Sequence, residues 1–410
     1  MMSKKLLQIN VTANWGSTGK IAEQIGLCAM AKGWESYIAY GRMVNPSKNK
    51  LIKIGSQLDV YEHYAESRFL DKEGLASRKS TKKFVQLVED IKPDIVQLHN
   101  IHDHWLNYKI LFEYLNQTDI KLVWTFHDFW TITGHCSHFV QVGCSRFQTG
   151  CYACPYTKGK LLPLLKRTRR NYNLKKILFS ANKNLTIVPV SEWVGNNVKK
   201  SFLKDKPIFV IPNGVDTDVF KPTYMDGKYL FDGKFVIMAV SSQWKSNSKG
   251  LEDYKAMAKM LQDDEIIVLV GVTDEVSKNF PKNIVGIRRT NNQQELAALY
   301  TRADVVCSFS AAETFGLTII EGNACGTPAV VYNNTAPPSL ITAETGFVVP
   351  NKDYKSAYHA IEEIRSKGKY AYSEACIRFA QEKYSKDKCF EKYINLYENL
   401  IKHKSCIDSL

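Results

Sequence analysis

The chain has 410 residues, of which 44% are hydrophobic and 23% charged, an ordinary globular composition for a chain too long for one core. Its 55 Lys and Arg residues exceed the 41 acidic residues, and the net charge of +14 favours anionic partners such as nucleic acid, acidic lipid or phosphorylated substrates. No apolar run approaches the roughly 18 residues of a membrane span, which argues against the class of membrane-spanning proteins. The N-terminal stretch is too short and too polar for a secretory signal, so the ten cysteines are expected to be reduced thiols in the cytoplasm.

Short apolar runs alternate with helical patterns along the chain, which predicts an α/β fold with parallel sheets covered by helices. Helices are expected over 293–302 and from near Gly316. A Pro-, Gly- and Asp-rich stretch, "IPNGVDTDVFKPT" at 211–223, reads as a linker between two such sets. The expected strands are Leu6–Val11, Ile95–Leu98, Leu122–Phe126, Leu185–Val190, Ile208–Ile211, Phe235–Val240, Ile266–Val270, Val305–Phe309 and Ala329–Tyr332.

The loop "NWGSTGK" at 14–20 lies between the first expected strand and a helical pattern. It is not a Walker A loop, because only Ser17 and Thr18 separate Gly16 from Gly19, and Ile21 follows the lysine. A strand, a glycine loop and a helix in this order can present backbone N–H groups to an anion. A tight turn that simply requires glycines explains the loop equally well, and the residues alone leave both readings open.

Ligands of open α/β sheets bind beyond the carboxyl ends of the strands, so residues directly after strands are the candidate functional residues. His127 and Asp128 follow one strand in "WTFHDFW". A core histidine whose hydrogen bonds are satisfied inside the protein is the alternative for His127, but its position after a strand and beside Asp128 favours a functional role. His99, His102 and His104 crowd another loop, where the polar rim of an acceptor site is favoured over a metal site.

The same reasoning selects residues in the second half of the chain. In "ETFGLTIIEG", Glu313 precedes a helix and Glu321 lies within it, while the N–H groups of Gly316 and Leu317 at the helix start could face a diphosphate. Glu321 is expected on a partly buried face, where ligand hydroxyls would supply the partner that a buried carboxylate needs. After another strand, "WKSNSKG" supplies Lys245 and Lys249, and a lysine there can neutralise a leaving diphosphate.

Together these motifs resemble the retaining family-4 glycosyltransferases of the GT-B fold. The resemblance rests on E-x7-E in "ETFGLTIIE", the following "GTPAVV" strand, "IPNGVD" and the first glycine loop, and it covers nearly the whole chain. The "HDFWTITGHC" stretch with the cysteines after it is similar to enzymes of bacterial capsule, O-antigen and colanic-acid assembly. The implied architecture is two Rossmann-like domains facing a cleft, residues 1–212 for the acceptor and 213–384 for the nucleotide sugar, with a helix at 385–410 packing back on the first domain.

The resemblance also implies roles for individual residues. Gly16 and Gly19 would approach the donor phosphates, His127 would contact the transferred sugar, and Lys249 would bind the diphosphate. The remaining implied donor contacts are Glu313 with the sugar, Glu321 with the ribose, and Lys245, Phe315, Gly316 and Leu317; His99 and Asp128 would face the acceptor. The family usually has an arginine six residues before the equivalent of Lys249, and here that position is Gln243, so Lys245 takes over that charge or the phosphate clamp is weaker.

Four cysteines, Cys136, Cys144, Cys151 and Cys154, form the pattern C-x7-C-x6-C-x2-C. Four thiolates satisfy a structural zinc, but the spacing before the final C-x2-C is irregular, so buried free thiols remain the alternative. Asp216 and Asp218 match the D-x-D metal motif of other glycosyltransferases, yet they lie in the expected linker and are interpreted as linker residues. No cofactor is therefore expected for catalysis.

Residues 156–183 combine leucines with lysines and arginines. A basic helix with an apolar face can lie on an anionic membrane, and an ordinary basic surface helix is the alternative. The sequence thus predicts a retaining glycosyltransferase, peripheral on the inner face of the cell membrane, that uses a nucleotide sugar and a glycan or polyprenyl-diphosphate-linked acceptor. The rival of another class, a zinc-containing nucleic-acid-binding protein, fits the charge and the cysteines but has no recognition motif and leaves the strand-end carboxylates unexplained.

Overall fold

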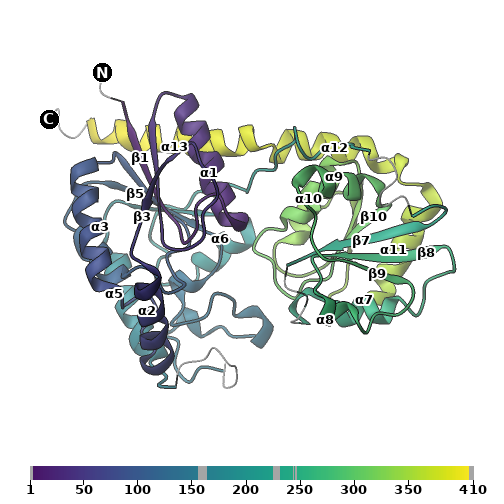
Figure 1. Ribbon diagram of the computed structural model, residues 1–410, viewed down its shortest axis with the longest axis horizontal. Coiled ribbons are helices and arrows are strands. Elements are labelled where there is room, and N and C mark those ends of the chain that lie inside the picture. Colours follow the sequence, from purple (N-terminus) through teal and green to yellow (C-terminus); the bar gives the residue numbers. More distant parts are fainter. Residues whose placement is uncertain (1–2, 156–163, 225–230, 243, 245–246, 406–410) are drawn as a thin grey trace. The chain divides into compact units, whose positions relative to one another are not determined.

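The chain folds into two compact units, which are described separately. The computed structural model describes residues 3–155, 164–224, 231–242, 244 and 247–405 (Figure 1). Unit 1 comprises Met1–Pro212 together with Phe390–Leu410, and unit 2 comprises Asn213–Cys389.

Unit 1 is built on a six-stranded, wholly parallel sheet of order β3-β2-β1-β4-β5-β6. This is the strand order of the Rossmann fold, and its topological switch point lies between β1 and β4. The strands are β1 Lys5–Ile9, β2 Glu35–Tyr40, β3 Lys50–Lys53, β4 Ile95–Leu98, β5 Lys121–Phe126 and β6 Leu185–Pro189. The helices are α1 Gly16–Ala31, α2 Gln57–Leu70, α3 Arg78–Ile91, α4 Tyr108–Leu115, α5 Thr168–Ala181 and α6 Glu192–Val198, and short 3-10 turns cover Trp130–Ile132, Val140–Val142 and Arg146–Gln148.

Unit 2 repeats this topology with the order β12-β11-β10-β7-β8-β9, again all parallel, so its switch point lies between β7 and β10. Its strands are β7 Phe235–Val240, β8 Glu265–Val270, β9 Ile284–Ile287, β10 Val305–Ser308, β11 Ala329–Tyr332 and β12 Gly346–Val349. The helices are α7 Leu251–Met257, α8 Asp274–Ser277, α9 Gln293–Arg302, α10 Leu317–Ala324, α11 Tyr354–Lys367 and α12 Tyr370–Tyr384, with 3-10 turns at Asn247–Lys249 and Pro337–Leu340.

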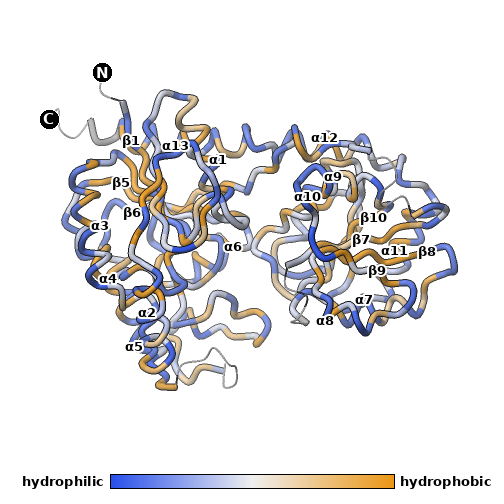
Figure 2. The backbone as a smooth tube through the Cα atoms, viewed as in Figure 1, coloured by the Kyte–Doolittle hydropathy of each residue, from blue (hydrophilic) through white to orange (hydrophobic). Residues whose placement is uncertain are grey.

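Each sheet carries the most hydrophobic stretches of its unit, as Figure 2 shows. The central strands are buried on both faces; β4, β8 and β11 are buried at every position. This pattern is typical of parallel sheets that have helices on both sides. The expected α/β fold with two Rossmann-like halves is therefore confirmed.

The last helix, α13 Lys386–Ser405, packs against unit 1 from Phe390 onward (Figure 1). Tyr393 and Tyr397 are fully buried, and the hydroxyl of Tyr397 donates to Gln97 Oε1 at 2.5 Å in β4. Thr125 Oγ1 in β5 donates to the hydroxyl of Tyr393 at 3.3 Å. α13 therefore satisfies polar groups inside the sheet as well as covering it.

One expected strand is not found. The stretch Ile208–Ile211 runs beside β6, but its pairing is limited to a single bridge between Ile187 and Ile208. The N–H of Ile211 still donates to the carbonyl of Pro189 at 3.1 Å, but proline at position 189 of β6 cannot donate in return, so a second bridge does not form.

Candidate active site

The strongest constellation lies at the switch point of unit 2, where the chain leaves β7 and β10. Lys249 ends the 3-10 turn after β7, and its Nζ lies 2.5 Å from Oε1 of Glu313, which belongs to the loop after β10. Both side chains are partly buried, 20% and 24% exposed. The expected diphosphate and sugar residues, 64 positions apart in sequence, are thus a contacting ion pair at the place where Rossmann sheets bind ligands.

Backbone contacts hold these two loops together. Ala311 N–H donates to Ser248 O at 2.8 Å. Gly250 has φ +74°, and a Cβ there would lie 2.5 Å from the carbonyl oxygen of Phe309, so only glycine allows this approach. The backbone of Glu313 is anchored in addition by Thr335 Oγ1, which accepts from its N–H at 3.0 Å. The Lys249–Glu313 pair is therefore placed by backbone structure that does not depend on either side chain.

Helix α10 starts next to this pair. Gly316 is its N-cap, with φ +113°, and no side chain caps the first turn, so the N–H groups from Leu317 onward are not satisfied by a capping side chain. Phe315, in contrast, is 3% exposed and packs on Tyr384, so its side chain belongs to the core and only its backbone could meet a donor.

The sequence argument for Glu321 needs a correction. The hydroxyl of Tyr300, a buried residue of α9, donates to Oε2 of Glu321 at 3.0 Å. The carboxylate thus has a partner inside the protein, because α9 and α10 pack side by side. A ribose contact for Glu321 stays a prediction, but it no longer follows from the need of a buried carboxylate for a partner.

The positions of Gln243 and Lys245 lie outside the described residues, so the question of which residue replaces the family arginine stays open. The D-x-D pair of the linker is bound to α13. Lys386 Nζ contacts Asp216 Oδ1 at 2.9 Å and Asp218 Oδ2 at 3.2 Å. The interpretation of these aspartates as linker residues stays a prediction.

In the first glycine loop of unit 1, Gly16 and Gly19 differ in the space around them. A Cβ on Gly19 would lie 2.6 Å from Oγ1 of Thr12, so this glycine is needed for the loop to fold onto α1. Gly16 has φ +64° and open space around it. A tight turn that requires glycine therefore explains Gly19. Gly16 lies at the start of α1, which has no capping side chain, and remains the residue that an anion could approach.

Two histidines from neighbouring strand ends are in contact. His99 follows β4 and His127 follows β5; Nδ1 of His99 lies 3.0 Å from Nε2 of His127, and the rings are nearly parallel. His99 is 2% exposed and bonds Gln8 Oε1 through its Nε2 at 3.1 Å. Both ring nitrogens of His99 thus face protein groups in the interior, and a contact with the acceptor stays a prediction.

Asp128 points to a different histidine. Its Oδ2 lies 2.8 Å from Nε2 of His102, and its Oδ1 accepts from the N–H of Trp130 at 2.8 Å. Burial alone would lower the pKa of His102, but the carboxylates of Asp128 and Asp103 outweigh it and hold that pKa well above the ordinary value for histidine. The pair is therefore an imidazolium–carboxylate pair that sequence reasoning did not foresee, because it depends on β4 and β5 being neighbours.

His102 lines a polar cavity of about 370 Å³ at the carboxyl ends of β4 and β5. The lining also includes Tyr64, Glu73, Asp103, His104, His135 and His138. Hydroxyl-rich ligands suit such a wall, since it offers both donors and acceptors. The three histidines of the 99–104 loop point to different partners: His99 to His127, His102 to Asp128, and His104 to Ser67.

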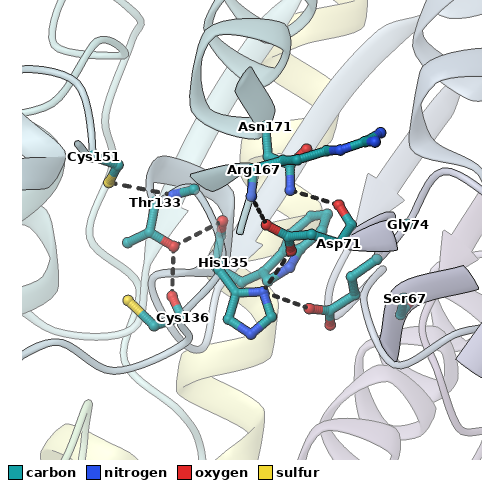
Figure 3. A network of polar contacts seen from close by, with 12 residues as sticks. Ser67, Asp71, Gly74, Thr133, His135, Cys136, Cys151, Arg167 and Asn171 are labelled. Carbon is teal, nitrogen blue, oxygen red and sulfur yellow. Dashed lines mark hydrogen bonds and ion pairs between the residues drawn. The ribbon is translucent and has the colours of Figure 1, made fainter. Parts of the chain in front are cut away.

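Asp71 fixes one wall of this cavity (Figure 3). The residue is 1% exposed, and its carboxylate accepts from the N–H of Arg167 at 2.6 Å and from Nδ1 of His135 at 3.2 Å. Its carbonyl accepts from Asn171 Nδ2 at 2.8 Å. One aspartate at the end of α2 therefore joins the 127–138 loop to the start of α5. No motif in the sequence marks it.

The four cysteines are close enough to influence one another. Burial, followed by the neighbouring thiol of Cys151, raises the pKa of Cys136 to about 12. Gly134 N–H donates to Sγ of Cys151 at 3.3 Å. Among the described residues, however, the three ligand atoms that lie within 4.8 Å of one another belong to Glu73, His102 and Asp103 instead. Zinc at the cysteines stays a prediction, which metal analysis of the purified protein would check.

The basic leucine-rich segment differs from the expected helix. The helix α5 begins only at Thr168, so Leu164 and Leu165 precede it, and residues 156–163 lie outside the described part. Lys175, one of the basic residues of this segment, is 1% exposed and donates to the carbonyl of Trp130 at 2.6 Å. Burial lowers the pKa of Lys175 to about 7.

Comparison with known proteins gives the class of this fold and site. The family model "Glycosyltransferase Family 4" matches residues 25–219, and "Glycosyl transferases group 1" matches residues 228–383. Between them the models cover most of the chain. The chain therefore belongs to this family of glycosyltransferases and is a transferase.

Individual relatives agree with this assignment. WcaC of Escherichia coli strain K12, named for colanic acid biosynthesis, is 20% identical over 96% of this chain and 100% of its own length. The sucrose-phosphate synthase of Thermosynechococcus elongatus has the same fold, with a TM-score of 0.72, 17% identity and coverage of 98% of this chain and 100% of that one. HepE of Anabaena, solved with UDP-glucose, has a TM-score of 0.63 at 15% identity, covering 96% of this chain and 99% of that one. The GT-B fold is confirmed. In the described part of the chain, a helix long and apolar enough to cross a membrane is not found.

Proposed function

We propose that the protein transfers a sugar, with retention, from a nucleotide sugar to a glycan or lipid-linked glycan acceptor in bacterial surface polysaccharide assembly. The Lys249–Glu313 pair carries the proposal, since it combines an ammonium suited to a diphosphate with a carboxylate suited to sugar hydroxyls. The uncapped start of α10 lies in the same loop as Glu313 and adds backbone N–H groups for phosphate oxygens. HepE was solved with UDP-glucose and WcaC is named for colanic acid biosynthesis, which supports the donor class and the role.

The chemistry assigned to these residues is electrostatic. As the bond between the anomeric carbon and the diphosphate oxygen breaks, negative charge grows on the leaving group, and Lys249 with the N–H groups of Gly316 and Leu317 stabilises it. The acceptor hydroxyl attacks the same face, its oxygen bonds the anomeric carbon, and its proton passes to the leaving phosphate. Glu313 orients the sugar through its hydroxyls. No protein nucleophile is required in this scheme.

For unit 1 we assign the acceptor to the cavity beside Asp128. The His102–Asp128 pair and the polar wall offer hydrogen bonds of both kinds to a glycan. His127, which follows β5 and reaches the same edge of the sheet, contacts a hydroxyl of the transferred sugar.

A donor screen tests the proposal. The protein is screened with UDP-glucose, GDP-mannose and ADP-glucose, each compared with the same nucleotide without its sugar. At least one of these sugars should raise the melting temperature of the protein, because a ligand bound only to the folded state stabilises it. DNA and RNA oligonucleotides should give no such shift. Anomeric analysis of the product by NMR should show the configuration of the donor. A response to nucleic acid with none to any nucleotide sugar would instead favour the nucleic-acid-binding rival.

We also propose that unit 1 binds anionic membrane surfaces. Leu164, Leu165 and Ile177 are exposed at 63%, 48% and 68%. Ile177 also lines a groove of about 810 Å³, together with Leu75, Ile110 and basic side chains that include Lys72, Arg78, Lys109, Arg169 and Arg170. Lys72 and Arg78 pair with Glu66, and Lys109 pairs with Glu113. Apolar side chains next to further positive charge suit a bilayer that carries acidic headgroups. Within the described part of the chain, Arg169 and Arg170 have no ion-pair partner.

Replacement of Lys166, Arg167, Arg169 and Arg170 by Gln should weaken binding to vesicles of anionic phospholipid, and binding by the unchanged protein should fall with salt. Vesicle co-sedimentation measures both. A matched control replaces Lys183, Lys199, Lys200 and Lys204, four exposed lysines of the same unit, which removes the same charge elsewhere. Equal loss in both variants, or equal binding to neutral vesicles, would contradict a specific membrane surface.

A further inference from the structure

A chain of three buried side chains leads from the interior of unit 1 to His127. Gln8, in β1, is 0% exposed, and its Nε2 donates to the carbonyl of Ala22 at 2.8 Å. A carbonyl can only accept, so this contact fixes the orientation of the Gln8 amide and leaves Oε1 facing His99. The chain then continues through His99 to His127 over distances of 3.1 and 3.0 Å.

The direction of each hydrogen bond in this chain follows from the first one and from the neutral state of His99. Because Oε1 of Gln8 is an acceptor, Nε2 of His99 must carry a proton and donate. Burial holds the pKa of His99 well below the ordinary value, so His99 is neutral and its Nδ1 has only a lone pair. The proton between His99 and His127 therefore belongs to Nε2 of His127.

This assignment determines what His127 can offer to a ligand. Burial lowers the pKa of His127 to about 4, so the ring is neutral and its second nitrogen, Nδ1, is an acceptor. No partner for Nδ1 of His127 is found among the described residues, and the residue as a whole is 9% exposed. Without the contact to His99, a neutral imidazole would be free to exchange its tautomers.

We infer that Gln8 and His99 are positioning residues that hold His127 in the Nε2–H tautomer, so that its Nδ1 accepts a hydrogen bond from a hydroxyl of the sugar substrate. The inference rests on the proposed function for the sugar, but the tautomer itself does not. Gln8 and His99 never touch the substrate; they act through the ring that does.

The chain provides a matched control. Gln97 in β4 pairs in register with Gln8 and is equally buried, yet it bonds Thr125 and Tyr397 and takes no part in the relay. Gln8→Leu and Gln97→Leu therefore remove the same amide from adjacent strands, at comparable cost in buried hydrogen bonds. Only Gln8→Leu deprives His99 of its acceptor.

The first measurement needs no substrate. Protein labelled with ¹⁵N-histidine is examined by long-range ¹H–¹⁵N correlation at neutral pH, and the His127 signals are assigned by their loss in His127→Ala. We expect the Nε2–H tautomer alone in the unchanged protein and in Gln97→Leu, and a mixture of tautomers in Gln8→Leu. An Nδ1–H ring or an imidazolium in the unchanged protein, or an unaltered spectrum in Gln8→Leu, would overturn the relay.

The second measurement is kcat/KM for nucleotide release from UDP-glucose or GDP-mannose. Gln8→Leu should lower it about tenfold relative to Gln97→Leu, the effect of one neutral hydrogen bond lost in the transition state. Binding of the bare nucleotide should not change. An equal effect of the two substitutions would refute the positioning role. If the unchanged protein turns over no nucleotide sugar, the proposed function is wrong. The NMR spectra test the tautomer of His127 independently of that result.

Discussion

Glu313→Gln is expected to lower sugar transfer by about a hundredfold or more, the effect of replacing a charged acceptor of the sugar hydroxyls by a neutral amide. Gln keeps the shape of the side chain. The contacts that anchor this position, from Thr335 to its N–H and from its carbonyl to the N–H of Ala336, belong to the backbone and persist. The loss should therefore appear in kcat/KM, with little change in the melting temperature.

Glu344→Gln serves as the control, since Glu344 belongs to the same unit, is 72% exposed and contacts only Arg378 among the ion pairs of the described residues. It should transfer sugar at the unchanged rate. Turnover like that of the unchanged protein in a folded Glu313→Gln variant would remove Glu313 from the catalytic residues.

Lys249→Ala should lower kcat by about a hundredfold and weaken donor binding much less, because the ammonium acts on charge that develops as the diphosphate leaves. Its ion pair with Glu313 is partly exposed, so its loss should cost the fold little. Lys255→Ala is a suitable control, since Lys255 lies on α7 just after the same loop and pairs with Glu252. Steady-state kinetics with separately measured donor affinity distinguish the two effects.

Sugar transfer should also persist in EDTA. Asp216 and Asp218 form ion pairs with Lys386, and the charge of the leaving diphosphate is neutralised by Lys249 and the N–H groups at the start of α10. Activity that disappears with the chelator and returns with magnesium or manganese alone would contradict this assignment of charge.

For Lys249→Ala, an increase in KM at constant kcat would contradict the catalytic role and would place the lysine in ground-state binding only.

The strands and helices that could be predicted from sequence are those whose buried residues form a recognisable apolar pattern. The bounds of β4, β7, β11 and α9 agree with the expected ranges, because each apolar run is limited by polar residues or turns. The missed strands lie toward the edges of the sheets or contain glycine. β3, an edge strand, is mostly exposed and carries lysine at both ends, and β9 and β12, the edges of the second sheet, each contain a glycine.

The candidate site was predictable one residue at a time, but its contacts were not. Each strand end could be read from the local pattern, whereas the order of the strands could not. Lys249 meets Glu313 because β7 and β10 are neighbours, and His99 meets His127 because β4 and β5 are neighbours. The same limit explains Tyr300, which satisfies Glu321 across two helices and which no motif marks.

The packing of α13 has a consequence for how the chain is synthesised. In the order of translation, unit 2 is an insertion of 213–389 into unit 1, whose final helix is made last. Until Tyr393 and Tyr397 emerge from the ribosome, Gln97 in the nascent sheet lacks a hydrogen-bond donor and an apolar face of the sheet stays uncovered. Unit 2 can therefore mature first although its sequence follows, and a fragment ending at residue 212 would expose the surface that chaperones bind.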